Sequence, residues 1–195
     1  MKRIGIFSGT FNPVHAGHIG FALQSLTQAK LDKVYLMPER YREGKSDVAH
    51  FAHRVAMVRQ AIRPHRQLGL IESSDVSFSV NKTLVKLRNQ FYGYRLVFLV
   101  GSDSLKTMGS WPGVENLLKT SELVVGIRKA DEADVATWVQ ALPVNPRQLT
   151  LIPSHAPAVS STKIREALRR SETAEGTLSS VRRYSDRNWL YVSLT

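Results

Sequence analysis

Two histidines three residues apart are the first candidates for chemistry in this chain. His15 and His18 close the stretch GTFNPVHAGH, residues 9–18, which follows a short apolar run. If a helix begins near Gly17, both imidazoles face the same ligand, and the N–H groups of its first turn attract an anion. Gly9 allows a ligand to approach the main chain closely. The stretch therefore predicts a phosphate-binding turn.

Two simpler interpretations of this histidine pair compete with phosphate binding. One is a loop with a histidine at a helix start, and the other is a metal site, for which no third ligand is visible nearby. The stretch lacks the GxGxxG and Walker A spacings, so the usual dinucleotide and P-loop sites are excluded. Its position between an apolar strand and a helix favours phosphate binding. A second pair, His50 and His53, has no further ligands and is interpreted as structural.

Short apolar runs alternate with helical patterns along the whole chain. The strands we expect are residues 3–8, 33–38, 68–73, 95–103, 121–129 and 148–153, and the expected helices are residues 17–30, 50–62, 83–91 and 161–170. This alternation predicts an α/β fold: a Rossmann-like parallel sheet with helices on both faces, in a single domain over residues 1–195. Because ligands bind beyond the carboxyl ends of such strands, the candidate loops are residues 9–18, 38–45, 101–111 and 153–165.

The charge and cysteine content narrow the class of function. A formal net charge of +11, from 27 Lys and Arg against 16 Asp and Glu, attracts nucleic acids, acidic membranes or small phosphorylated substrates. Charge alone does not choose among them. The absence of cysteine excludes disulfides and a thiolate nucleophile, which fits a cytoplasmic protein. No apolar run approaches the ~18 residues of a membrane span.

Two motifs at opposite ends of the chain carry a family resemblance. GTFNPVHAGH looks like the first signature of the HxGH nucleotidyltransferases, and VSSTKIR, residues 159–165, looks like the second, ISSTxIR. Residues 53–61 and 98–111 and the terminal RYSDRNWLY are also similar to family segments. The chain therefore resembles the nicotinate/nicotinamide mononucleotide adenylyltransferases, and the resemblance spans nearly all of it.

The resemblance implies an adenylyl transfer in NAD biosynthesis, by a nucleotide-binding transferase. The phosphate of a pyridine mononucleotide attacks the α-phosphorus of ATP and releases pyrophosphate. Such a phosphate is already anionic near neutral pH, with a second pKa of ~6, so no general base is needed. Catalysis then consists mostly of positioning and of stabilising charge on the transferring group.

The resemblance also assigns roles to individual residues. It implies three catalytic residues that contact the ATP phosphates, His15, His18 and Arg165. Further ATP-binding residues are Gly9, Thr10 and Phe11 along the nucleotide, Gly101 and Asp103 at the ribose, and Ser161 and Thr162 at the β- and γ-phosphates. Acceptor-binding residues are Lys45, Phe78, Ser79 and Trp111. Magnesium is expected to bridge the phosphates, held mainly by substrate oxygens rather than by a protein metal site.

Simpler roles stay open for three of these residues. Asp103 would equally suit a helix cap, Trp111 the core and Lys45 a solvated position. The solvated face of a helix is the interpretation adopted for Arg169 and Arg170.

Two departures from the family pattern concern the acceptor. Relatives carry Pro-Pro-His-Lys/Arg where this chain has REGK, residues 42–45, and Ser-Tyr-Thr where it has SFSVNKTL, residues 77–84. Alternatives are therefore a related HxGH transferase with another phosphorylated acceptor, or a non-catalytic protein that binds nucleotides or nucleic acid. The partners we expect are ATP and a phosphorylated small molecule, with neither a membrane nor a nucleic acid. The oligomeric state is left open.

Overall fold

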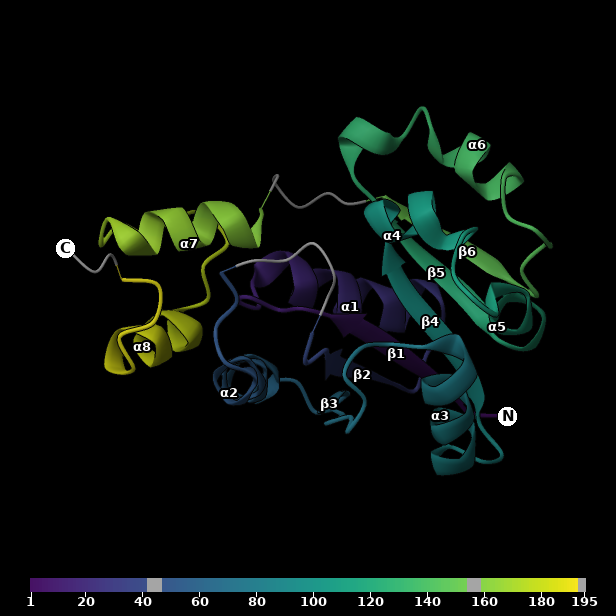
Figure 1. The fold of residues 1–195 in the computed structure, drawn as a ribbon, viewed down its shortest axis with the longest axis horizontal. Helices are drawn as coiled ribbons and strands as arrows, with labels where there is room; N and C mark the ends of the chain where they lie inside the picture. Colours follow the sequence, from purple (N-terminus) through teal and green to yellow (C-terminus); the bar gives the residue numbers. More distant parts are fainter. Residues whose placement is uncertain (42–46, 154–158, 193–195) are drawn as a thin grey trace.

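A six-stranded parallel sheet forms the centre of the molecule (Figure 1). The computed structural model describes residues 1–41, 47–153 and 159–192. The strands are β1 (Arg3–Gly9), β2 (Lys33–Pro38), β3 (Leu68–Leu70), β4 (Arg95–Gly101), β5 (Glu122–Ile127) and β6 (Leu149–Pro153). Their order is β3-β2-β1-β4-β5-β6, and all neighbours are parallel. The strand order reverses between β1 and β4, and ligands bind at such a switch point.

Helices cover both faces of this sheet, as the sequence predicted. Within the described residues they are α1 (Ala16–Gln28), α2 (Phe51–Ile62), α3 (Val85–Gln90), α4 (Ser102–Met108), α5 (Val114–Thr120), α6 (Val135–Gln140), α7 (Ser161–Arg169) and α8 (Ser179–Arg187). Two short turns add to them, the π-helical η1 (Val80–Leu84) and the 3₁₀ turn η2 (Lys129–Asp131). None of these helices is long and apolar enough to cross a membrane.

Alternating side chains of the central strands build two separate cores. Phe7 and Leu99 belong to a buried cluster that includes side chains of α1, α2 and α8. Ile6 and Phe98, one position earlier on each strand, belong to a second cluster with η1 and α3 to α6. Successive residues of a strand point to opposite faces, so a strand buried on both sides is apolar throughout. This explains the continuous apolar runs of β1 and β4.

The structure corrects several expected element bounds. The expected strand 68–73 ends at Leu70, and the strand 95–103 ends at Gly101, directly before α4. The expected helix 83–91 is a π-helical turn followed by α3. Helices α4, α5, α6 and α8 were missed: the first three have only six or seven residues, and α8 contains few apolar residues. Helices of six or seven residues are too short to show a distinct helical periodicity.

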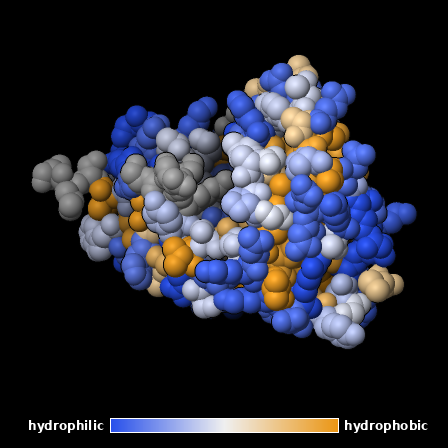
Figure 2. Space-filling view, turned by 45° about the vertical axis from the view of Figure 1, so that its right-hand side comes forward, coloured by the Kyte–Doolittle hydropathy of each residue, from blue (hydrophilic) through white to orange (hydrophobic). Residues whose placement is uncertain are grey.

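The surface is mainly hydrophilic. On the face seen in Figure 2, hydrophobic residues gather in small groups among hydrophilic ones. The large hydrophobic side chains that are exposed come from separate parts of the chain, for example Tyr92 and Trp189. With a net charge of +11, this surface suits anionic ligands.

A buried carboxylate ties together three strands at the amino-terminal edge of the sheet. Glu122, at the start of β5, is 1% exposed and forms ion pairs with Arg3 and Arg95 at the starts of β1 and β4. The Arg95 Nη1–Glu122 Oε1 distance is 3.2 Å. These contacts fix the edge opposite to the carboxyl ends of the strands.

We expect Glu122→Gln to lower the free energy of unfolding by about 2–3 kcal/mol, because two arginines lose their carboxylate partner. The measurement is urea denaturation at pH 7. Glu115→Gln, which removes an exposed partner of Lys119, is the control and should change the stability by less than about 0.5 kcal/mol. An equally small effect at Glu122 would contradict a structural role for this ion cluster.

Candidate active site

The two sequence signatures meet at the carboxyl end of β1. His15 caps the amino end of α1, and Ser161 opens α7. The Ser161 hydroxyl donates a hydrogen bond of 3.0 Å to the carbonyl of Pro13, and Arg165 Nη1 donates one of 2.9 Å to the carbonyl of Asn12. Residues about 150 positions apart in the sequence therefore form one structure at the switch point.

The two histidines form a stacked pair. Their ring centroids are 3.7 Å apart with an angle of 27° between the planes. The main-chain N–H of His15 donates to Nδ1 of His18 over 3.2 Å, which leaves the proton of a neutral His18 on Nε2. A Cβ on Gly17 would lie 3.1 Å from the His15 ring. Glycine between the histidines thus makes room for the stacked arrangement.

Both imidazoles are neutral in this environment. Burial lowers the pKa of His15 to about 4, with a smaller contribution from the positive charge of Arg128. Burial also lowers the pKa of His18 well below its ordinary value, helped by His15 and Arg128. Phe7 and Phe11 place their rings against His18 and keep water from this side. An anion bound beside the pair would raise both pKa values, because it favours the charged imidazolium.

Arg128 is a functional candidate that the sequence reasoning missed. It follows β5 directly and forms a bidentate ion pair with Asp103 of α4. Arg128 Nη2 lies 2.7 Å from Asp103 Oδ2, and Nη1 lies 3.0 Å from Oδ1. In the sequence, its position as a cationic residue at the carboxyl end of the predicted strand 121–129 could have identified it. Asp103 lies in the first turn of α4, which Gly101 caps, so it is not the cap residue itself.

Asn12 holds the turn between β1 and α1, and the sequence reasoning missed it as well. The residue is 4% exposed, and both polar atoms of its side chain are hydrogen-bonded. Nδ2 donates to the carbonyl of Asp47 over 2.9 Å, while Oδ1 accepts from the Ala49 N–H and from the Tyr191 hydroxyl at 3.1 and 2.8 Å. The segment before α2 and the segment after α8 therefore both fasten this turn.

Arg54 of α2 holds the main chain of the same turn. Its side chain is buried, with 1% exposure, and donates to the carbonyls of Thr10, Glu39, Arg40 and Ala49 over 2.6 to 3.0 Å. The sequence marked residues 53–61 only as similar to a family segment. The structure gives Arg54 a more specific task, because it fixes the main chain at Thr10.

Phe11 lies in the turn between β1 and α1. Its side chain is 2% exposed and lies in the core, and its φ of 47° turns the main chain sharply. A Cβ at Gly9 would come within 3.2 Å of the Phe11 ring. Phe11 can therefore offer only its backbone to a ligand. Thr162 lies exposed in the first turn of α7.

Unpaired polar atoms concentrate at this turn. Among the described residues, five buried side-chain polar atoms have no hydrogen-bond partner, and three of them are Thr10 Oγ1, His15 Nδ1 and Arg165 Nε. Buried polar groups are nearly always paired in native proteins. A phosphate-bearing ligand could satisfy these groups.

Three of the four expected acceptor residues, Phe78, Ser79 and Trp111, lie within the described part of the chain. Phe78 and Trp111 lie side by side, with ring centroids 6.3 Å apart, and Phe78 also contacts Phe98 of β4 at 5.5 Å. Ser79 precedes η1, and its main-chain N–H donates to Thr83 Oγ1 over 3.0 Å. Lys45 lies outside the described residues.

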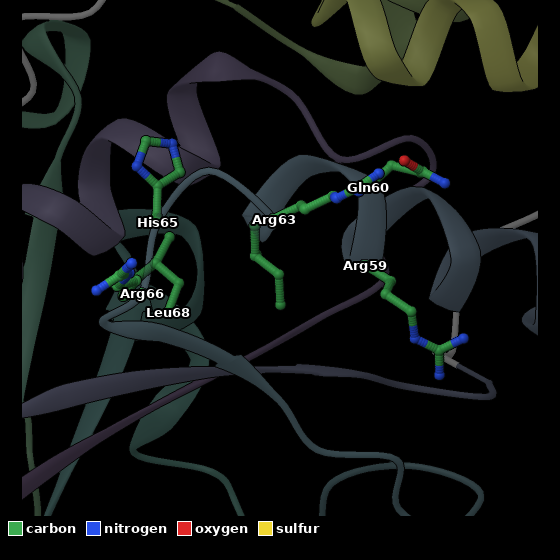
Figure 3. A pocket seen from close by; sticks show the side chains of 7 residues that line it. Arg59, Gln60, Arg63, His65, Arg66 and Leu68 are labelled. Atoms are coloured by element: carbon green, nitrogen blue, oxygen red, sulfur yellow. The ribbon is translucent and has the colours of Figure 1, made fainter.

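Neither His53 nor a hollow at the end of α2 belongs to this site. His53 Nδ1 lies 3.1 Å from the Tyr184 hydroxyl, which agrees with a structural role. The described parts of the chain contain no group of three His, Asp or Glu side chains suited to a metal. A hollow of about 480 Å³ lies at the end of α2 (Figure 3) and is lined by Arg59, Gln60, Ile62, Arg63, His65, Arg66 and Leu68. It contains none of the predicted site residues.

The chain is similar to known nucleotidyltransferases over most of its length. The cytidylyltransferase-like family matches residues 6–167. The nicotinate-nucleotide adenylyltransferase of Bacillus subtilis (strain 168) is 32% identical over 199 residues, which cover 99% of this chain and 100% of that protein. The Clostridium perfringens (strain SM101 / Type A) protein named "Probable nicotinate-nucleotide adenylyltransferase" is 36% identical over 131 residues, or 64% of each chain. The match thus spans slightly under two thirds of that relative.

A solved structure shares the whole fold. It is the Plasmodium falciparum nicotinic acid mononucleotide adenylyltransferase complexed with NaAD, with a TM-score of 0.81 over 98% of each chain. At 19% identity, this likeness shows the fold alone.

The lowered pKa of His15 predicts a loss of stability in acid. The unfolded chain, with a pKa near 6.5, takes up a proton before the folded protein does, so stability is present above pH 6.5 and falls as the pH approaches 4. His15 alone should remove about 2 kcal/mol between pH 7.5 and pH 5. Urea denaturation at both pH values measures the loss, and His15→Asn should reduce it by that amount. A wild-type loss that persists in full in His15→Asn would contradict the assignment.

Proposed function

We propose a function from one premise: the chain belongs to the cytidylyltransferase-like family and, within it, to the nicotinate-nucleotide adenylyltransferases. On this premise the protein transfers AMP from ATP to nicotinate or nicotinamide mononucleotide and releases pyrophosphate, as a step of NAD biosynthesis. The observation that carries the proposal is the junction of the two signatures at the switch point, where Ser161 and Arg165 bond to the turn that holds His15. The unpaired polar atoms of Thr10, His15 and Arg165 at this junction support it.

The chemistry needs no proton-abstracting residue. A phosphate oxygen of the mononucleotide forms a bond to the α-phosphorus, and the bond between that phosphorus and the bridging oxygen to the β-phosphate breaks. Pyrophosphate leaves with the electron pair. The His18 Nε2–H is the donor that we assign to the α-phosphate oxygens, whose charge changes most in the transition state. These oxygens become better hydrogen-bond acceptors as their negative charge develops, which strengthens the hydrogen bond donated by the neutral His18.

Arg165, Ser161 and the free N–H groups at the start of α7 are assigned to the β- and γ-phosphates. Arg128 lies near both histidines and adds positive charge on the other side of the turn. Charged donors on both sides suit a leaving group whose negative charge increases during the reaction.

Magnesium fits this site as an ion carried by the substrate. Magnesium prefers oxygen ligands and retains several waters. The groups described around the turn are mainly imidazole, guanidinium and N–H donors, and the Asp103 carboxylate is engaged by Arg128. Phosphate oxygens and water would therefore supply most of its ligands, and the ion would neutralise charge on the phosphates.

The aromatic pair Phe78 and Trp111 is assigned to the pyridine ring, with Ser79 and Lys45 as polar partners of the acceptor. We also propose that residues 1–195 form a single catalytic domain and that the enzyme acts in the cytoplasm. The altered acceptor segments, residues 42–45 and 77–84, favour one second candidate, a related transferase that adenylylates another phosphorylated acceptor.

The function is tested by pyrophosphate release with ATP and magnesium. The acceptor panel contains nicotinate mononucleotide, nicotinamide mononucleotide, phosphopantetheine and glycerol phosphate, with CTP replacing ATP in parallel. Turnover with a pyridine mononucleotide supports the proposal. Turnover with phosphopantetheine or glycerol phosphate alone would favour the second candidate, and no turnover with any pair would contradict nucleotidyl transfer.

His18→Ala should lower kcat by about 10²-fold or more, the scale of one lost transition-state donor. The KM for ATP should change far less. Steady-state kinetics give both values, and His65→Ala, outside the site, is the control. Near-normal kcat in His18→Ala would overturn its assigned role.

Trp111→Ala should raise the KM for the acceptor about tenfold while changing the KM for ATP less than about twofold, because stacking area is lost only at the acceptor. Trp138→Ala removes a partly buried tryptophan that packs on the same core and serves as the control. A defect confined to ATP would place Trp111 outside the acceptor pocket.

A further inference from the structure

Two arginines of α7 converge on a single carboxylate oxygen. Arg169 lies one helical turn after Arg165, and its Nη2 forms an ion pair with Asp47 Oδ2. Arg165 Nε lies 3.6 Å from the same Oδ2. Long side chains on a helix lean toward its amino end, so the Arg169 guanidinium group reaches the same carboxylate oxygen as that of Arg165. Two guanidinium groups directed at one oxygen form an anion-binding arrangement, which Asp47 fills.

Asp47 satisfies this arrangement only in part. Arg165 Nε is buried and has no hydrogen-bond acceptor, since 3.6 Å is too long for a hydrogen bond. The other end of this guanidinium, Nη1, is anchored to the carbonyl of Asn12. The group is therefore held in place at one end while its Nε faces an anion that does not reach it.

The burial of the three side chains shows which partner can leave. The Arg165 and Arg169 side chains are 15% and 33% exposed, whereas the Asp47 side chain is 58% exposed. Asp47 thus lies on the solvent side of two more buried cations. Ion pairs with an exposed member contribute little to stability, so another anion can displace the carboxylate at small cost.

We propose that Arg169 is a second triphosphate-binding cation beside Arg165, and that Asp47 is an internal anion which the terminal phosphate of ATP displaces. This inference rests on the proposed function and deepens it. Asp47 directs a single oxygen, Oδ2, at the two arginines. A phosphate group offers several oxygens, so it can accept from Arg165 Nε and from Arg169 together. When the Asp47 carboxylate moves away, its repulsion of the incoming triphosphate is also reduced.

The contrary role for Asp47 is to orient Arg165 for catalysis. The two roles differ in sign: an internal competitor weakens ATP binding, whereas an orienting residue strengthens it. Asp47→Asn separates them, because asparagine retains the main-chain carbonyl that accepts from Asn12 Nδ2. The turn keeps this hydrogen bond while the side chain loses its charge.

The test is isothermal titration calorimetry of the full chain with ATP and with AMP. Asp47→Asn should lower the Kd for ATP about three- to tenfold at low salt, and the gain should shrink as salt is raised. Arg169→Met should raise the Kd for ATP by a similar factor. AMP lacks the β- and γ-phosphates, so its Kd should stay within about twofold in both variants. Arg170→Met and Glu172→Gln remove the neighbouring surface pair of this region and should leave the Kd for ATP unchanged.

Each outcome separates this inference from the proposed function. If the wild-type protein binds no ATP, the proposed function fails and this inference fails with it. If the wild type binds ATP but Asp47→Asn binds it equally or less tightly, the internal-anion role is overturned while the function stands. An unchanged Kd in Arg169→Met would overturn the role of that arginine. Thermal melting of each variant confirms that it is folded before titration.

Discussion

The hydrogen bonds that converge on Asn12 are the constraint on which the site depends. Asn12 lies in the turn that leaves β1, and it bonds to the segment before α2, to α7 and to the segment after α8. Each partner comes from a different part of the chain, so the turn takes this shape only in the assembled fold. Arg54 adds a fourth constraint at Thr10. The histidine pair is therefore positioned by long-range contacts rather than by its own local sequence.

The charges of the site fall into two matched groups on either side of that turn. Arg128 pairs with Asp103 near the histidines, and Arg165 and Arg169 pair with Asp47 on the α7 side. Each group of cations thus carries its own exposed carboxylate in the free protein. The imidazoles between them avoid positive charge by losing their protons. A polyphosphate would reverse both conditions, because it supplies the negative charge that arginines and imidazoles favour.

The sequence predicted the features that repeat or that lie in short motifs. The apolar runs of β1 and β4 identified buried parallel strands, because a strand buried on both faces is apolar at every position. The two signatures identified the turn and the α7 start. Asn12, Arg128 and Tyr191 escaped prediction because each is a single polar residue whose partners are distant in sequence. Short helices such as α4 escaped because two turns of helix show no distinct periodicity.

The donor and acceptor halves of the site differ in how strongly the fold determines them. The proposed phosphate half would use main-chain groups and helix starts, whose geometry follows from strand order, so a short motif suffices to specify it. The proposed acceptor half uses side-chain packing of Phe78 against Phe98 and Trp111, from three separate segments. Many residue combinations can fill such a pocket without disturbing the sheet. Intact signatures can therefore accompany altered acceptor segments, and on the proposed assignment ring selectivity would depend on those packed aromatic side chains rather than on the fold.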